Sequence, residues 1–363
     1  MERNCDIVMK GGVTSGIVYP AAVVEIARTF RFKNVGGTSA GAIAAALTAA
    51  AKRRRVAEST NAGFERLAEI PEWLANDRRL ARLFVPNART RGLFRTATGL
   101  AGRSRLPAWF VKPLRLFAAL PFASLMGAVP GIAFAVAVAR TLSATAWWLS
   151  TVDFLLSLFT IAAGMLLAVL ITVARNALAR LPENGFGMVT GVDDCNRENP
   201  IALSTWLAKE LELTAGLPDG RIPLTFGMLW DAHRDPTFDG LPEPPAEPDV
   251  NLEMITTNAS WGRPYNFPTT LHSFFFDPGE MRKFFPDHVV DWMIARHRRP
   301  RDAEEAERFK AYSPRLALPI AGDLPVIVAT RMSLAFPILL SAVPLWACDC
   351  LGEETRYFSE YAQ

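Results

Sequence analysis

The sequence is poor in residues that bind metal ions or form disulfide bonds. Its 363 residues include four histidines and four cysteines, the latter at Cys5, Cys195, Cys348 and Cys350. Cys348 and Cys350 form a C-x-C pair, but a zinc site would also need a second pair or a nearby histidine. We therefore expect reduced cysteines in a cytoplasmic compartment and no zinc site.

Charge of either sign is also scarce. Charged residues make up 21% of the chain, and the net charge is +3. Without a basic patch interleaved with aromatic residues, this balance excludes nucleic acid as an expected partner. The N-terminal residues contain no long apolar stretch, so we expect no secretory signal peptide. With so little charge, the mean hydropathy is +0.15, which is more apolar than that of a typical soluble enzyme and indicates more buried surface than an ordinary core provides.

Two nucleotide-binding motifs are absent from the glycine turn near the N-terminus. This turn, Lys10 to Gly16, follows a short predicted strand at Ile7 to Met9 and precedes a predicted helix that reaches Ala27. Its glycines lack the G-x-G-x-x-G spacing, and no Gly-Lys-Ser/Thr follows, which excludes a dinucleotide fingerprint and a Walker loop. Consecutive glycines can also direct neighbouring N–H groups at one point, as an oxyanion hole requires. An oxyanion turn and a simple phosphate-binding turn both fit this segment.

A second glycine turn contains a serine. The segment Gly37-Thr38-Ser39-Ala40-Gly41 lies between a predicted strand around Phe32 and Val35 and an alanine-rich helix from Ala42 to Ala51. G-x-S-x-G at a strand-to-helix junction is the nucleophile elbow pattern, in which small residues allow a sharp turn that exposes the serine hydroxyl. The helix N-terminus favours developing negative charge. The pattern predicts Ser39 as a nucleophile for acyl transfer.

Long apolar runs occupy the middle of the chain. Leu116 to Ala139, which two prolines interrupt, and Phe154 to Ala174 contain no ionisable side chain. Each could cross about 30 Å of hydrocarbon as a helix. Trp147 and Trp148 between them suit a membrane interface, and the basic flanks suit the cytoplasmic side. We expect a transmembrane helical hairpin over residues 107–180; the alternatives are a buried helix pair or a re-entrant first segment. The basic flanks are Arg103, Arg105, Lys112, Arg115, Arg175 and Arg180.

The rest of the chain predicts an α/β fold that this hairpin interrupts. Residues 1–106 begin with alternating strands and helices, and residues 181–363 supply the second half.

The charge run from Arg298 to Arg308 predicts the solvated start of a helix. The run from Lys52 to Arg55 ends the helix that follows Ser39, where cations complement the helix dipole. Contact with anionic lipid headgroups is the alternative for this second run.

Taken together, the two glycine turns resemble those of the patatin-like phospholipase family. The serine elbow follows the first turn by some 25 residues, as in that family. Four further segments are similar: Pro223 to Gly227, Gly262 to Tyr265, Met332 to Pro337 and Ser341 to Trp346. The resemblance covers both predicted halves of the α/β fold and leaves out the hairpin.

The resemblance implies an enzyme with a three-layer α/β fold. It would hydrolyse phospholipids or acylglycerols without a metal or an organic cofactor. Ser39 would be the nucleophile, the N–H groups of Gly11, Gly12 and Val13 would form the oxyanion hole, and a carboxylate would act as the base of a Ser-Asp dyad. The hairpin would hold this cytoplasmic domain at a membrane, which in a bacterium would be the inner membrane. The oligomeric state is not implied.

Departures from the family pattern concern the oxyanion turn and the base. Val13 replaces the third glycine of the first turn, and Ser15 replaces its usual basic residue. The acid that aligns with the family's Asp-Gly-Gly aspartate is Glu360, three residues before the end of the sequence, so the chain resembles a truncated relative. Asp219 and Asp239 also precede glycines, but turn chemistry explains both.

Two alternatives to the active dyad follow from these departures. One of the four histidines could serve as the base in a triad, because triads are defined by geometry and not by sequence position. The chain could also be a catalytically inactive, membrane-anchored relative that binds lipid or a partner.

Overall fold

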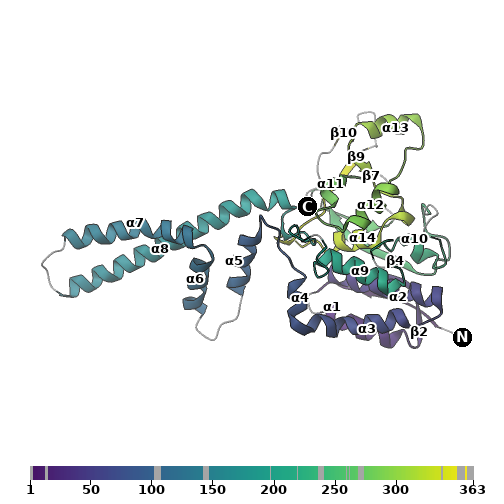
Figure 1. Cartoon of the computed structure of the whole chain (residues 1–363), viewed down its shortest axis with the longest axis horizontal. Helices are drawn as coiled ribbons and strands as arrows, with labels where there is room; N and C mark the ends of the chain where they lie inside the picture. The colour runs from purple at the N-terminus through teal and green to yellow at the C-terminus, as the bar shows by residue number, and fades with distance from the viewer. Residues whose placement is uncertain are drawn as a thin grey trace. The chain divides into compact units, whose positions relative to one another are not determined.

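Strands and helices alternate through the N-terminal part of the chain and form a mixed α/β fold (Figure 1). The computed structural model describes residues 3–12, 15–101, 108–141, 147–196, 198–218, 220–235, 241–258, 260, 262–268, 274–336, 338–349 and 356–357. The chain divides into two compact units, residues 1–87 with 185–363, and residues 88–184. The predicted α/β class is confirmed, and the second unit contains the segment predicted as a hairpin.

The sheet that carries Ser39 has four strands in the order β1-β2-β4-β5. β1 (Arg3–Met9), β2 (Phe30–Thr38) and β4 (Asn251–Asn258) are parallel, and β5 (Arg263–Phe267) is antiparallel to β4. Met9 pairs with Gly37, and Thr38 pairs with Ile255. The carboxyl ends of the three parallel strands therefore meet at one edge of the sheet, where ligands bind in open α/β sheets.

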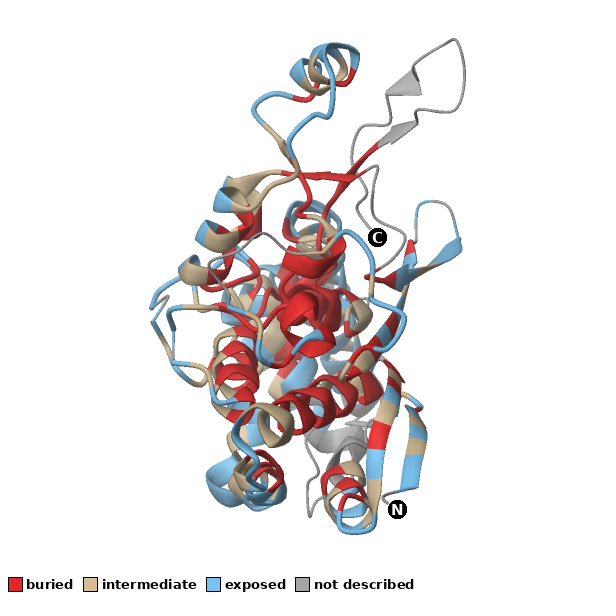
Figure 2. Ribbon diagram, turned by 90° about the vertical axis from the view of Figure 1, so that its right-hand side faces the viewer, coloured by how far each residue is buried: buried red, intermediate tan, exposed pale blue. Residues whose placement is uncertain are grey.

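Helix α2 (Ala40–Glu58) forms the centre of the first unit. Its residues from Ala44 to Lys52 are all buried, and it packs on β2, α1 (Ser15–Ile26), α3 (Ala62–Ala75) and α9 (Leu203–Ala215). Alanine allows this close packing and is also the best helix former. Figure 2 shows buried residues gathered in the helices of this unit.

The remaining strands form two smaller sheets. β3 (Gly187–Val189) pairs in parallel with β8 (Ile338–Leu340). The other sheet has the order β10-β9-β6-β7, from β10 (Arg356–Tyr357), β9 (Trp346–Asp349), β6 (Phe274–Phe276) and β7 (Leu316–Ala317). Phe275 stacks on Tyr312 beside it, with ring centroids 4.1 Å apart. The helices of this half are α10 (Phe226–Trp230), α11 (Pro278–Met281), α12 (Asp287–Ala295), α13 (Ala303–Lys310) and α14 (Val326–Ser333).

The second unit is helical and exposes many apolar side chains. It contains α5 (Arg91–Ala101), α6 (Ala108–Ala119), α7 (Pro121–Thr141) and α8 (Trp147–Arg180). The first predicted span is divided between α6 and α7, because Pro121 begins a new helix, a position where its missing N–H is not needed. Among the described helices, α8 alone contains a segment, Phe154–Arg180, long and apolar enough to cross a membrane.

Glycines bring α7 and α8 together within the second unit. A Cβ built on Gly127 would lie 2.6 Å from Cβ of Ala168, and one on Gly131 would lie 2.6 Å from Cα of Ile161. The opposite glycine, Gly164, would collide with the backbone of Gly127. Small residues four apart on both helices are the packing device of membrane helix pairs.

Candidate active site

Ser39 lies on the sharp turn between β2 and α2. Its φ is 54° and its ψ is −129°, a backbone conformation that residues with a side chain rarely adopt. The residue is exposed, at the N-terminus of a 19-residue helix. The structure therefore has the strained strand-to-helix turn that the G-x-S-x-G pattern predicts, with the hydroxyl-bearing residue at the positive end of the helix dipole.

Neighbouring glycines make this turn sterically feasible. A Cβ built on Gly37 would lie 2.8 Å from Cβ of Ala45. One built on Gly41 would lie 2.7 Å from the carbonyl carbon of Met9. Real Cβ atoms do not approach so closely, so only glycine fits at either position, and β1, β2 and α2 can meet at the elbow.

The first glycine turn lies directly against Ser39. A Cβ built on Gly11 would be 2.7 Å from Cβ of Ser39 and 3.3 Å from its Oγ. The contact follows from the parallel pairing of β1 with β2, because both turns leave the same edge of the sheet. The structure thus brings Gly11 next to Ser39, and Gly12 follows Gly11 in the chain. Val13 lies outside the described residues.

A second serine, Ser333, at the end of α14, fixes the backbone of the elbow by hydrogen bonds. The backbone N–H of Ser39 donates to Oγ of Ser333 at 3.1 Å, and that hydroxyl donates to the carbonyl of Ile255 at 2.6 Å. Thr256 donates to the carbonyl of Met332 at 3.0 Å, so the end of α14 is fixed to the edge of β4. In the sequence, Ser333 is noted only as part of Met332 to Pro337, a segment similar to the patatin-like family. No local pattern assigned it a role, because its partner is 294 residues away.

A buried arginine anchors the helix that carries Ser333. Arg331 donates from Nη2 to the carbonyls of Thr190 at 3.1 Å and Ser341 at 2.7 Å, which joins α14 to β3 and β8. Burial lowers the pKa of Arg331 to about 10, so the side chain remains a cation at neutral pH. The similar segments near Met332 and Ser341 therefore support the elbow through hydrogen bonds between side chains and backbone groups.

The proposed base, Glu360, lies outside the described residues, as do Asp219, Asp239 and His272. Within the described ranges, Oγ of Ser39 makes no hydrogen bond to a carboxylate or an imidazole. His288 instead bonds Glu212 (Nε2 to Oε1, 2.7 Å), and Nδ1 of His297 lies 2.7 Å from the carbonyl of Ile294. These two histidines have structural partners away from Ser39.

One cluster in the described part of the chain has the residue types of a metal site. Asp193, Asp194 and Cys195 place three ligand atoms within 4.8 Å of one another on a surface loop. The carboxylate of Asp193 already accepts the N–H of Cys195 at 3.0 Å and the amide of Asn199 at 3.0 Å. Turn formation accounts for this cluster, so we assign no metal to it.

Comparison with known proteins gives a relative but does not show a family. The chain is 38% identical over 357 residues to a protein of Rhizobium meliloti (strain 1021) described as an RpoH suppressor. The alignment covers 94% of this chain and 52% of that protein, so the chain spans about half the length of the curated relative that it matches. That description names neither a reaction nor a substrate. No family model matches the sequence, and no solved structure matches the chain.

Proposed function

We propose that this protein is a membrane-associated serine hydrolase of the patatin-like type that cleaves acyl esters of phospholipids or acylglycerols. The observation that carries the proposal is the contact between Gly11 and Ser39. It joins a strained serine at a helix N-terminus to a glycine turn that can supply oxyanion donors. A serine placed in this way needs only a proton acceptor to act as a nucleophile.

The proposed reaction has two stages. Oγ of Ser39 bonds to the ester carbonyl carbon while its proton passes to a carboxylate, for which Glu360 is the aligned residue. The N–H groups of Gly11, Gly12 and Val13 stabilise the oxyanion. The ester bond then breaks, and the leaving alcohol takes the proton. Water cleaves the acyl-serine in the second stage, which releases a fatty acid and restores Ser39. None of these steps uses a metal or an organic cofactor.

The helices of the second unit support the lipid part of the proposal. α8 exposes large apolar side chains along its length, among them Phe154, Phe159, Leu167 and Ile171. Contiguous apolar surface of this kind marks a membrane or protein interface, and helix α8 has the length to span a bilayer. We propose that α7 and α8 form a membrane hairpin that keeps the α/β unit at the cytoplasmic surface, close to its substrate.

An activity-based probe tests the nucleophile. The full chain, purified in a neutral detergent, should be labelled by a fluorophosphonate, and Ser39→Ala should abolish labelling and lower ester hydrolysis by at least about 10³-fold. Ser157→Ala, which removes a hydroxyl from α8, is the matched control and should be labelled like the wild type.

Two results would reject the proposal that Ser39 is a catalytic nucleophile. One is no labelling of folded wild-type protein, and the other is equal labelling of Ser39→Ala. The first result would favour the inactive relative that binds lipid or a partner, and the second would place the labelled nucleophile at a residue other than Ser39.

A further inference from the structure

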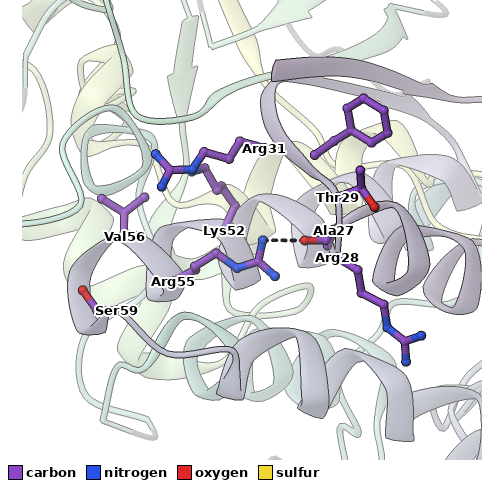
Figure 3. Close-up of a pocket in the computed structure, with 9 residues that line it drawn as sticks. Ala27, Arg28, Thr29, Arg31, Lys52, Arg55, Val56 and Ser59 are labelled. Carbon is purple, nitrogen blue, oxygen red and sulfur yellow. Dashed lines mark hydrogen bonds between the residues drawn. The ribbon is translucent and has the colours of Figure 1, made fainter. Parts of the chain in front are cut away.

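A basic pocket opens at the end of α2 opposite Ser39 (Figure 3). Its volume is about 440 Å³, and it lies between the end of α2 and the turn after α1. Arg28, Arg31, Lys52 and Arg55 supply four cationic groups to its wall, and Thr29 and Ser59 supply hydroxyls. Lys52 is 13 residues along the helix from Ser39, or about 20 Å at 1.5 Å per residue, so the pocket is separate from the candidate active site.

Lys52 is the residue that most needs an explanation. It is 6% exposed, and within the described part of the chain its ammonium makes no hydrogen bond and no ion pair. The attractive charge that acts on it is that of Asp249, whose carboxylate accepts the backbone N–H of Ala232 at 2.9 Å. Burial lowers the pKa of Lys52, and the charges of Arg31, Arg55 and Lys33 lower it further. The side chain is largely buried and lines the pocket, and a cation held there without a protein partner is unfavourable unless an anion neutralises it.

Helix-end chemistry explains the neighbours of Lys52 but not Lys52 itself. Arg53 donates to the carbonyl of Ala215 at 2.7 Å, and Arg54 forms an ion pair with Glu58 at 2.8 Å. Arg55 donates to the carbonyl of Ala27 at 2.9 Å and lies over the ring of Phe64. Arg53 and Arg55 therefore complement carbonyls at the ends of α9 and α1, whereas the sequence predicts that the run complements the dipole of α2, which continues to Glu58. Lys52 instead contributes its charge to the pocket, and Figure 3 shows it between Arg31 and Arg55.

We propose that this pocket binds a phosphate group, carried by a small soluble phosphoester or by a lipid headgroup. Guanidinium and ammonium groups with nearby hydroxyls are the donors that phosphate oxygens prefer, and charge-assisted hydrogen bonds of this kind are the strong ones. The helix ends at the pocket present carbonyls, which do not attract anions. Attraction must therefore come from the side chains, and a bound phosphate would give Lys52 the partner that it lacks.

Calorimetric titration of the full chain with inorganic phosphate, in a neutral detergent, tests the site. Lys52→Met keeps the apolar stem and removes the charge, so phosphate affinity should fall by at least about tenfold, while Lys52→Arg should retain most of it. Lys283→Met removes the same charge from an exposed side chain elsewhere in this unit and should bind phosphate like the wild type.

A stability measurement separates binding from folding. Phosphate should raise the melting temperature of the wild type and leave that of Lys52→Met unchanged. Without phosphate, Lys52→Met should be at least as stable as the wild type, because the variant removes a charge from a largely buried side chain that lies among other cations. If Lys52→Met fails to fold, Arg28→Gln gives the test, since the Arg28 side chain is 71% exposed and its loss should weaken binding severalfold.

Short-chain phosphatidate and glycerol phosphate distinguish the two sources of the phosphate group. Tighter binding of phosphatidate than of glycerol phosphate, with the same dependence on Lys52, would identify a lipid headgroup. The reverse order would identify a soluble phosphoester. Failure of the wild type to bind any of the three probes, or equal binding by Lys52→Met, would overturn the proposal. Neither result depends on Ser39, so loss of this site would leave the hydrolase proposal intact.

Discussion

The glycines around the elbow differ in the space that an added side chain would have. Gly37 faces α2, where an added Cβ would lie 2.8 Å from Cβ of Ala45, whereas a Cβ on its neighbour Gly36 would have no contact shorter than 3.7 Å. The two residues lie side by side in β2 and differ in the face of the strand they occupy. Close approach at Gly37 therefore sets the position of the helix that begins after Ser39.

This difference predicts the outcome of two alanine substitutions. Gly37→Ala should lower the free energy of unfolding by about 1–3 kcal/mol, because the new methyl group forces α2 away from β2. Gly36→Ala should change it by less than about 0.5 kcal/mol and serves as the matched control. Urea denaturation followed by circular dichroism measures both values. Equal stability of the two variants would contradict the close approach that defines the elbow.

Single residues also mark the limit of what the sequence predicts. The local pattern at Gly37 to Gly41 is sufficient to predict the turn, because every residue involved is adjacent in sequence. The hydrogen bond from Ser39 to Ser333 joins residues that no local pattern relates. Lys52 could not be recognised either, because a basic run at a helix end has the same sequence whether its side chains are solvated or buried.

Helix α13 differs from its prediction in the solvent exposure of its first turn. The run from Arg298 to Arg308 predicts the start of a solvated helix, and α13 does begin at Ala303. Glu305 is nevertheless buried, where it accepts hydrogen bonds from Arg298 at 2.7 Å and from the backbone N–H of Arg301 at 2.7 Å. The solvated interpretation is wrong for this one position, because two arginines that precede the helix fold back over its first turn.

The Glu305 contacts predict a defined dependence of stability on pH. Burial alone would raise the pKa of Glu305, but the hydrogen bonds from Arg298 and Arg301 lower it from 4.5 to about 2. The unfolded chain therefore binds the proton more tightly. The stabilisation is complete above pH 4.5 and is lost as the pH falls through about 2.

Replacement of the carboxylate by an amide measures this contribution. Glu305→Gln should lower the free energy of unfolding by about 1–3 kcal/mol at pH 7, and the difference from the wild type should shrink steadily below pH 4.5. Glu304→Gln, at a side chain that is 84% exposed, should have little effect at any pH. Urea denaturation at several pH values tests both variants. A difference that grows on acidification would reverse the assigned sign.

Longer elements were easier to predict than the contacts between them. The helix expected from Ala42 to Ala51 lies inside α2, and the strand expected around Phe32 and Val35 lies inside β2. The pairing of β2 with β4 was beyond sequence reasoning, because some 200 residues separate the two strands. Periodicity describes one element at a time, and pairing depends on which distant apolar faces meet.

For the whole molecule, the exposed apolar surface of α8 is the dominant feature. Such a surface in water would favour aggregation, whereas a bilayer would cover it. We therefore expect the full chain to remain in the membrane fraction after alkaline carbonate extraction. Release into the soluble fraction would contradict the membrane assignment.

A charge scan along α8 locates the span. Leu167→Arg places a charge near the middle of the Phe154–Arg180 segment and should reduce membrane retention, because a central arginine costs about 2.5–3.5 kcal/mol on insertion. Leu178→Arg is the matched control, since Leu178 is near the end of α8 and its arginine can reach the interface. Equal retention of both variants would favour an association that does not use α8 as a span.

The position of the second unit within the sequence determines when the first unit can fold during synthesis. β1, α1, β2 and α2 leave the ribosome before the apolar helices, but β2 finds its partner β4 only after those helices have been made. At a synthesis rate of about 5–20 residues per second, the edge of β2 that later pairs with β4 stays unpaired for roughly 10–40 s. An unpaired strand edge in a nascent chain is prone to aggregation, so we expect chaperones to bind the chain during this time. Synthesis of the apolar helices and completion of the sheet are therefore successive stages of one assembly process.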